Sequence, residues 1–341
     1  MKIALVCGSW PPERCGVGDY SAKLQHALQD AGVDVERIEL RGWSFRRSAH
    51  YRELLKYSGA DVIHVQYPSV GYGRSLVPAL TPFLGLNAPL VVTLHEYEIY
   101  RSYRRPWFWS FAYRARARLF SREAERAAFA KSFPRRAGDD HVVPIGSNIP
   151  VGHSRTRQEG SVAFFGLFWP GKGIEDMFDL ARQIKAVGGD PGRLSIVGAP
   201  VAGQGQFADF IRRQCGELGV RLFEDRPADE VADILSGHEF AYLPFPGGAD
   251  ERRGSLAAAI VNGCLPITRH GQATPDWLKN ATISSETPED AITILLNSEN
   301  RPDQMDSLRK NVQAAAERYA WPKIAQRHRS IYDAILADRA R

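Results

Sequence analysis

Short apolar segments alternate with amphipathic, helix-like stretches along this chain, and the alternation comes in two series. The first series has strand-like runs at residues 2–7, 34–40, 61–66, 89–95 and 141–145. The second series has them at residues 161–166, 193–198, 220–223, 239–244 and 265–268. Apolar strands separated by amphipathic helices form parallel sheets that helices cover on both faces. The pattern therefore predicts an α/β protein with two doubly wound domains.

The length of the chain agrees with two domains. A chain of 341 residues is long for one ordinary domain and suits two domains of about 150 residues each. The polar stretch between the two series, "IGSNIPVGHSRTRQEG", is broken by glycine and proline and is typical of a linker. We expect one domain over residues 1–155 and a second over residues 156–320.

The composition excludes several classes of protein. The chain is 44% hydrophobic and 24% charged, so it can bury a core and is not disordered. No apolar run approaches the roughly 20 residues of a transmembrane helix, and the first residues resemble a strand rather than a signal peptide. No C-x-x-C pair occurs, which indicates reduced thiols in a cytoplasmic protein and argues against zinc. The cysteines are Cys7, Cys15, Cys215 and Cys264.

Positive charge is concentrated in the first half of the chain. Residues 1–157 carry 23 Lys and Arg against 14 Asp and Glu, a net charge of +9, whereas the remainder carries 21 against 25, a net charge of −4. Residues 101–136 alone carry eleven basic residues, two acidic residues and several aromatic rings. This asymmetry favours an anionic partner. Three interpretations stay open: a membrane surface, a nucleic acid, and a solvated basic face without a partner.

In doubly wound sheets, ligands bind beyond the carboxyl ends of the strands. Glycines and charged residues follow several of the predicted strands, and Lys172 stands between two glycines just before a predicted helix. A cation and free helical N–H groups together suit a phosphate. The other residues in such places are Gly16, Gly18, Tyr72, His95, Glu96, Gly198, Arg226, Gly254 and Ser255.

Each of these positions also has a purely structural interpretation. Gly16 and Gly18 could supply only the backbone freedom of a turn, and their spacing lacks the third glycine of a dinucleotide-binding fingerprint. His95 could be a hydrogen-bonded core histidine. Ser255 could cap its helix instead of opening an anion site. Lys172 is followed by glycine, so the lysine does not belong to a Walker motif.

The motifs occur in an order that resembles the GT-B-fold retaining glycosyltransferases of the family 4 type, over nearly the whole chain. They are the loop "SWPPERCGVGDY", "TLHEY", "PIGSNIP", "FFG…GKG", "LSIVG", "LPF…ERRGSL…NGCLP" and the closing "YAWPKIAQRHRSIYDAIL". The resemblance implies two Rossmann-like domains facing a central cleft, the first for the acceptor and the second for a nucleotide-sugar. It also implies that a final helix at residues 321–341 packs back towards the N-terminal domain.

The resemblance assigns roles to individual residues. It implies that His95 and Glu251 act on the transferred sugar and that Lys172 contacts the diphosphate, so these three are the expected catalytic residues. No D-x-D triplet that would hold a metal on a diphosphate is present, and neither a metal nor a cofactor is expected. The expected donor-binding residues are Gly16, Gly18, Lys172, Gly198, Arg226, Glu251, Arg252, Arg253, Gly254, Ser255 and Leu256.

Two positions depart from the family pattern. Leu167 stands where the family has an arginine, and Ala259 replaces the second glutamate of its E-x7-E motif, the residue that grips the ribose. Each change removes a charged contact that is worth about 1.5–3 kcal/mol. Arg252 or Arg253 is a candidate replacement for the missing arginine, but the sequence offers none for the glutamate.

The expected activity is a metal-independent, retaining transfer of a sugar from a nucleotide-diphosphate donor to a glycan or polyprenyl-linked acceptor, in surface polysaccharide or glycoconjugate synthesis. The alternatives are a catalytically impaired binding protein and a sugar-nucleotide epimerase of the same fold. The protein is expected in the cytoplasm, with a contact to the inner face of the membrane and none to nucleic acid. The expected acceptor or membrane contacts are Tyr72, Glu96, Arg114, Arg116 and Arg118.

Overall fold

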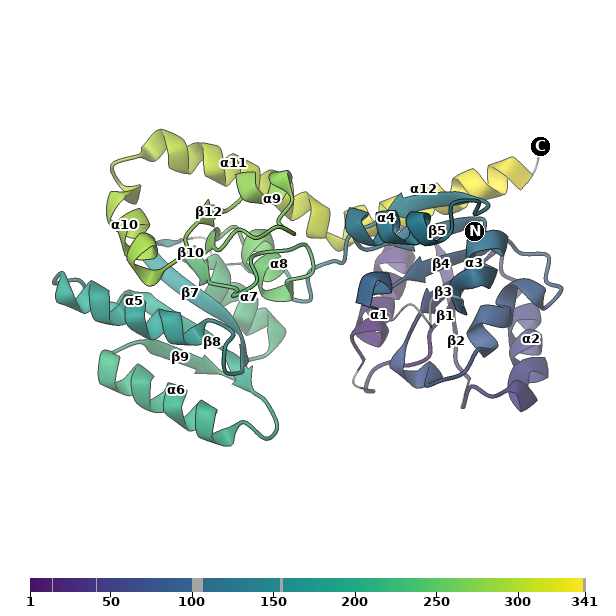
Figure 1. The fold of residues 1–341 in the computed structure, drawn as a ribbon, viewed down its shortest axis with the longest axis horizontal. Coiled ribbons are helices and arrows are strands. Elements are labelled where there is room, and N and C mark those ends of the chain that lie inside the picture. Colours follow the sequence, from purple (N-terminus) through teal and green to yellow (C-terminus); the bar gives the residue numbers. More distant parts are fainter. Residues whose placement is uncertain (14, 41, 100–106, 154–155, 340–341) are drawn as a thin grey trace. The chain divides into compact units, whose positions relative to one another are not determined.

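The computed structural model describes residues 1–13, 15–40, 42–99, 107–153 and 156–339. The chain forms two compact units, and each of them is built on a six-stranded, wholly parallel sheet in this described part. Unit 1 comprises Met1–Gly146 together with Trp321–Arg341, and unit 2 comprises Ser147–Ala320. Figure 1 shows the two units and labels their elements. The predicted α/β class and the pair of doubly wound domains are therefore confirmed.

The sheet of unit 1 has the strand order β2-β1-β3-β4-β5-β6. Its strands are β1 (Lys2–Val6), β2 (Asp34–Ile38), β3 (Val62–Tyr67), β4 (Leu90–Leu94), β5 (Ala117–Phe120) and β6 (Asp139–Val142). Its α-helices are α1 (Gly16–Asp30), α2 (Ser48–Tyr57), α3 (Trp109–Arg114), α4 (Glu123–Ser132) and α12 (Trp321–Arg339). Short 3-10 turns are η1 (Phe45–Arg47), η2 (Val70–Tyr72), η3 (Val77–Phe83) and η4 (Tyr97–Ile99).

Alternate residues of these strands enter two different cores. Ile3 and Leu5 of β1 pack with apolar residues of α1 and α12, whereas Ala4 and Val6 pack with residues of α2, α3 and α4. Strands that are buried on both faces read as continuous apolar runs. This explains why the sequence pattern of unit 1 is nearly unbroken in β1, β3 and β4.

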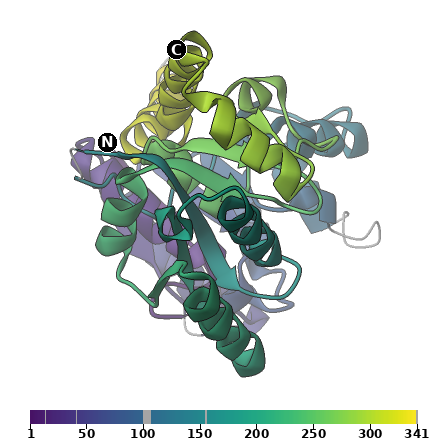
Figure 2. The same ribbon diagram turned by 90° about the vertical axis from the view of Figure 1, so that its left-hand side faces the viewer.

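The sheet of unit 2 has the strand order β12-β11-β10-β7-β8-β9. Its strands are β7 (Gln158–Phe168), β8 (Leu194–Pro200), β9 (Arg221–Glu224), β10 (His238–Leu243), β11 (Leu265–Thr268) and β12 (Ile283–Ser284). The helices that cover this sheet are visible in Figures 1 and 2. They are α5 (Ile174–Ala186), α6 (Gly205–Leu218), α7 (Ala228–Ser236), α8 (Gly254–Val261), α9 (Asp276–Asn280), α10 (Pro288–Ser298) and α11 (Pro302–Tyr319), with the 3-10 turn η6 (Pro191–Arg193).

The chain enters unit 2 at Ser147, earlier than residue 155, where the sequence analysis places the boundary. The reason is hydrogen bonding of the connecting segment. The backbone N–H of Ser147 donates to Tyr319 O at 3.1 Å, that of Gly152 donates to Asn262 Oδ1 at 2.7 Å, and that of His153 donates to Asp233 Oδ1 at 2.7 Å. The polar segment that reads as a linker is therefore tied to unit 2 by its backbone.

Candidate functional site

A cavity of about 600 Å³ opens in unit 2 at the carboxyl ends of β7, β8 and β9, beside the start of α8. It brings together many of the predicted donor-binding residues from separate parts of the chain: Lys172, Gly198, Arg226, Arg252, Arg253, Gly254 and Ser255. The remaining residues of its wall are Asn148, Ile149, Phe164, Phe165, Gly166, Leu167, Ala199, Asp225, Ala228, Val231 and Phe245.

The cavity carries an excess of positive charge. Lys172 is exposed in the loop before α5, and its ammonium group forms no ion pair with any described residue. Arg252 and Arg253 approach Asp250 Oδ2 only at 3.8 and 3.9 Å, and the Arg253 guanidinium also lies over the Phe245 ring, 4.9 Å from its centroid. These arginines therefore retain donors for an anionic ligand.

The N-terminus of α8 also faces this cavity. Gly254 and Ser255 line it as the first two residues of the helix, and the N-cap Arg253 offers no side-chain capping bond. The first backbone hydrogen bond of the helix is the one that the Ala257 N–H donates to Arg253 O at 2.9 Å. The N–H groups ahead of it have no acceptor within the helix, and uncapped groups at a helix start are the kind that bind an anion. The capping interpretation of Ser255 is wrong, because this residue lies inside the helix.

The two departures from the family pattern fall at different places. Leu167 is 59% exposed and lines the same cavity as Arg252 and Arg253, so these arginines stay candidate replacements for the missing arginine. Ala259 is fully buried in α8 and does not line the cavity. The ribose-gripping carboxylate of the family is therefore not replaced at that position.

Two further predicted donor residues lie outside the cavity wall. Leu256 is fully buried in the core of unit 2. Glu251 is half-buried directly before the arginine pair, in the turn that leads to α8. Burial raises the pKa of the neighbouring Tyr319, and the charges of Glu251 and Asp250 raise it further.

His95, at the carboxyl end of β4 in unit 1, belongs to a buried hydrogen-bond chain. It is 5% exposed, and its Nε2 lies 2.9 Å from Gln66 Oε1, so Nε2 carries the proton and donates. Gln66 Nε2 lies 3.2 Å from His64 Nε2, and His64 Nδ1 lies 2.6 Å from Tyr332 Oη. Burial, with a smaller contribution from His328, lowers the pKa of His95 to about 4. At neutral pH the ring is therefore an uncharged, oriented imidazole.

The two glycines of the first loop have different surroundings. A Cβ at Gly18 would lie 2.7 Å from Ser9 O, so the close packing of α1 on the loop requires a glycine there. A Cβ at Gly16, the first residue of α1, would meet nothing within 4 Å. Gly16 is exposed and leaves open space at a helix start, which is compatible with an approaching ligand. Its role stays a prediction.

Tyr72 and Glu96, both predicted acceptor contacts, differ in exposure. Tyr72 is 4% exposed, and its ring stands edge-on to Trp43 in the core, with centroids 4.6 Å apart. Its interpretation as an acceptor contact is therefore wrong, because the side chain is enclosed. Glu96 is exposed and has a left-handed backbone with a φ of 57°. It directly follows His95, so it remains available to a ligand at the carboxyl end of β4.

The interpretation of Arg118 as an acceptor or membrane contact is also wrong. Arg118 lies inside β5 and is fully buried, where Nε donates to Asp140 Oδ1 at 2.6 Å and Nη2 donates to Gly138 O at 3.0 Å. Nη1 donates to the carbonyl oxygens of Phe111, Ala112 and Ala115. Through these hydrogen bonds the Arg118 side chain links β5, β6 and α3.

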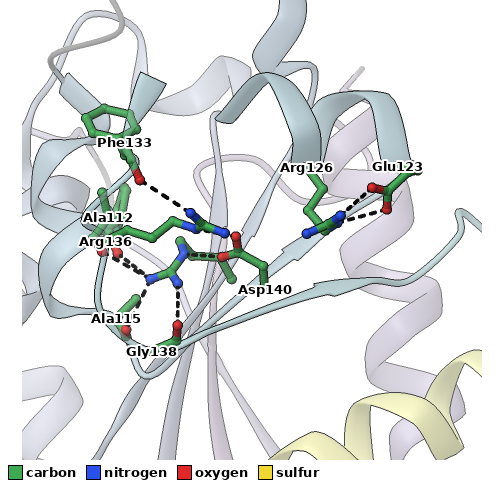
Figure 3. A network of polar contacts seen from close by, with 10 residues as sticks. Ala112, Ala115, Glu123, Arg126, Phe133, Arg136, Gly138 and Asp140 are labelled. Atoms are coloured by element: carbon green, nitrogen blue, oxygen red, sulfur yellow. Dashed lines mark hydrogen bonds and ion pairs between the residues drawn. The ribbon is translucent and has the colours of Figure 1, made fainter. Parts of the chain in front are cut away.

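Other basic residues of the segment 101–136 are paired as well. Asp140 also accepts from Arg136, and Arg126 pairs with Glu123 (Figure 3). Arg116 is exposed but paired with Asp338, and the nearly buried Arg122 is paired with Glu98. Residues 101–106 lie outside the described part. Much of the positive charge of the segment 101–136 is therefore neutralised by ion pairs within unit 1. Among the predicted contact residues, Arg114 is exposed and forms no ion pair with a described residue.

Asp225 and Gln66 were missed in the sequence analysis. Asp225 lines the cavity directly before Arg226, and its place after a predicted strand was the signal that could have found it. The sequence predicts Gln66 at the end of a buried strand, and only the pairing of β3 with β4 places it beside His95.

Within the described ranges, His, Cys, Asp and Glu side chains form no group of three that could hold a metal ion. No helix in that part of the chain combines the length and apolar character needed to cross a bilayer.

The comparisons with known proteins agree with this architecture. The model of glycosyltransferase family 4 matches residues 4–149, which comprise nearly all of the N-terminal segment of unit 1 and the first three residues of unit 2. No curated protein sequence matches the chain. Similar solved structures include HepE of Anabaena in complex with UDP, at 16% identity and a TM-score of 0.69 over 98% of this chain and 100% of that one.

Two further structures extend the likeness. A glycosyltransferase from Rickettsia africae is 12% identical with a TM-score of 0.71 over 98% of both chains. Sucrose-phosphate synthase from Thermosynechococcus elongatus is 16% identical with a TM-score of 0.63, over 99% of this chain and 100% of that one. The chain therefore has the GT-B fold of glycosyltransferases, and its N-terminal unit carries the sequence pattern of family 4. The fold that the motifs imply is confirmed over nearly the whole chain, and the resemblance to family 4 over residues 4–149, whereas the retaining stereochemistry stays a prediction.

Proposed function

We propose that this protein is a retaining glycosyltransferase that moves a sugar from a nucleoside-diphosphate donor to a glycan or lipid-linked acceptor, in surface polysaccharide or glycoconjugate synthesis. One observation carries the proposal: a single cavity is lined by Lys172, Arg252, Arg253 and the uncapped start of α8. HepE, with the same fold, was solved with UDP and with UDP-glucose, which supports a donor of this class.

The chemistry of such a site is stabilisation of a leaving group. When the bond between the anomeric carbon and the diphosphate breaks, negative charge develops on the departing phosphate oxygen. Fixed cations and helical N–H groups stabilise that charge without reorganising. The acceptor hydroxyl oxygen forms the new bond to the anomeric carbon, and its proton passes to the departing diphosphate. Attack from the same face as the leaving group retains the configuration.

Lys172→Ala tests the donor site. We expect the variant to lose about tenfold or more of its affinity for UDP or GDP, because a charge-assisted contact to phosphate is worth about 1.5–3 kcal/mol. Isothermal titration measures the affinity, and thermal unfolding checks the fold. Lys185→Ala is the matched control, since Lys185 is an exposed lysine in the last turn of α5, outside the cavity wall. Equal affinities in all three proteins would refute the assignment.

Glu251 and His95 are proposed to act on the sugar. Their alanine variants are expected to keep nucleoside-diphosphate binding and to lose transfer, which a radiolabelled-sugar assay measures. His95 is buried, so His95→Gln accompanies the alanine variant and tests whether loss of activity merely reflects unfolding.

Transfer by the parent protein is expected to persist in excess EDTA. NMR of the product's anomeric proton tests whether the anomeric configuration is retained.

A lipid-linked acceptor is favoured by an exposed cluster of unit 1. The rings of Phe83 and Trp109 are 48% and 51% exposed and stack with centroids 6.3 Å apart, and the Arg114 guanidinium lies 5.6 Å from the Phe83 centroid. Aromatic rings beside arginine suit the interface of an anionic bilayer. We expect the double variant Phe83→Ser and Trp109→Ser to sediment less with anionic liposomes at low salt, while Tyr57→Ser, at another exposed ring, sediments like the parent.

Two alternatives are separated from this proposal by their products. An epimerase of the same fold converts the donor sugar without an acceptor, whereas a transferase needs one. An impaired binding protein releases neither product, although it still binds the nucleotide. Chromatography of the donor after incubation with and without an acceptor glycan distinguishes the three.

A further inference from the structure

Asp225 holds an unusual backbone conformation at the wall of the nucleotide cavity. It directly follows β9, and its φ of 52° lies in the left-handed region, which is uncommon outside glycine although aspartate adopts it more readily than most residues. Its backbone N–H donates to Gly198 O at 2.8 Å, so the end of β8 holds the residue in place. Uncommon backbone conformations of this kind gather at ligand-binding positions.

The carboxylate of Asp225 is not used by the fold. The carboxylate of the neighbouring Glu224 accepts a hydrogen bond from Arg212 Nε at 2.8 Å. On the other side, Arg226 Nη1 lies 3.5 Å from Glu230 Oε2. Asp225 forms no ion pair or side-chain hydrogen bond with a described residue, although it lines a cavity that is rich in cations. It therefore offers two free acceptor oxygens to a ligand.

The strand order places Asp225 at the side of the cavity away from the predicted phosphate site. The predicted phosphate site follows β10 and β7, whereas Asp225 follows β9, and the order is β10-β7-β8-β9. Neighbouring strands lie about 4.8 Å apart, so β9 lies about 10 Å from β7 and about 14 Å from β10. In a nucleoside diphosphate the ribose stands between phosphate and base. With the diphosphate at α8, the base is the part that extends to β8 and β9.

We infer that Asp225 selects the nucleobase and that the donor is a guanosine-diphosphate sugar. This inference rests on the proposed function. A carboxylate only accepts hydrogen bonds, and guanine presents two adjacent donors, N1–H and N2–H, that match its two oxygens. The N3–H of uracil or thymine lies between two carbonyl oxygens, which repel a carboxylate. Adenine and cytosine place a single amino group beside an unprotonated ring nitrogen.

Titration of the whole protein with GDP, UDP and ADP tests the inference. The parent is expected to bind GDP about tenfold or more tightly than UDP, because the base contact is charge-assisted. Asp225→Asn keeps the size of the side chain and tolerates a left-handed backbone, but it replaces one acceptor by a donor. We expect it to lose about tenfold in GDP affinity and to leave UDP affinity within about twofold. Asp225→Gly, which also relieves the backbone, is expected to show the same loss.

Glu230→Gln is the matched control, because it changes the partner of Arg226 and is expected to leave the ratio of GDP to UDP affinity unchanged. If the parent binds UDP as well as GDP, or if both Asp225 variants lose both nucleotides equally, the inference is overturned while the proposed function stands. If the parent binds none of the three nucleotides, the proposed function fails, and this inference fails with it.

Discussion

At the scale of single residues, charge is a poor guide to position in this protein. Arg118 follows other arginines in "RARARLF", and that pattern reads as a solvated basic face. The register of β5 with β6 puts Arg118 opposite Asp140, and the carbonyl oxygens around it use its remaining donors. A partner 22 residues away cannot be predicted from the local pattern. The cavity residues Lys172, Gly254 and Ser255 were predictable because each lies where the chain passes from a strand to the start of the next helix.

Arg118→Ala is expected to lower the free energy of unfolding by about 3–5 kcal/mol, because it leaves the Asp140 carboxylate buried without its main partner. Denaturation in guanidinium chloride measures this loss. Arg114→Ala is the control, since an exposed arginine outside such a network changes stability by about 0.5 kcal/mol or less. Similar denaturation midpoints for the two variants would contradict the buried structural role of Arg118.

At the scale of elements, the sequence pattern predicted most strands to within a few residues. The strand predicted at residues 265–268 coincides with β11, and that at 2–7 differs from β1 by one residue at the end. β5 was missed because Arg118 interrupts its apolar run, and β12 was missed because it spans only two residues. Apolar periodicity records burial, so strands with a buried charge or with minimal length escape it.

The starts of α6 and α8 provide a matched pair for testing the anion site. Each helix begins with an exposed glycine whose Cβ would meet nothing within 4 Å, but only Gly254 lines the cavity. An aspartate at a helix start stabilises the helix by about 0.3–1 kcal/mol. Gly254→Asp is therefore expected to keep or slightly raise Tm and to weaken nucleoside-diphosphate binding about tenfold or more, because its carboxylate occupies the anion site.

Gly205→Asp is the control for this prediction. It adds the same charge to the start of α6, outside the cavity wall, and nucleotide affinity is expected to stay unchanged. Titration calorimetry and thermal unfolding measure both variants. Equal loss of affinity in the two would mean that net charge, and not the start of α8, governs binding.

At the scale of the whole molecule, the two units contain different groups of polar side chains. Unit 2 holds the cavity, with lysine and arginine side chains in its wall. Unit 1 holds a buried group of three neutral histidines, His64, His95 and His328. His64 lies within β3 and His95 directly follows β4, whereas His328 lies on α12, which returns to unit 1 after the whole of unit 2. The sequence could not show this grouping, since the partners lie far apart along the chain.

These histidines make unit 1 sensitive to acid. Burial lowers the pKa of His95 and His328 to about 4 and that of His64 well below its usual value, whereas an unfolded histidine titrates near 6.5. Between pH 6.5 and 4 the unfolded chain therefore binds protons that the folded unit does not, so stability falls as the pH falls. A pKa difference between 6.5 and about 4 corresponds to about 3 kcal/mol at pH 4 for His95 or His328, if each titrates independently.

Hydrogen exchange resolved by residue, corrected for intrinsic rates, separates the responses of the two units. Lowering the pH from 7 to 5 is expected to reduce protection more in residues 1–146 and 321–339, with their three buried histidines, than in residues 147–320, where burial lowers the pKa of His238 and His270. A nucleoside diphosphate at about 100 times its Kd is expected to add about 2.7 kcal/mol of protection, mainly in residues 147–320. His26→Gln, at an exposed histidine of α1, is the control and is expected to leave the acid response unchanged. An equal loss of protection in both units at pH 5 would contradict the assignment of acid sensitivity to the buried histidines.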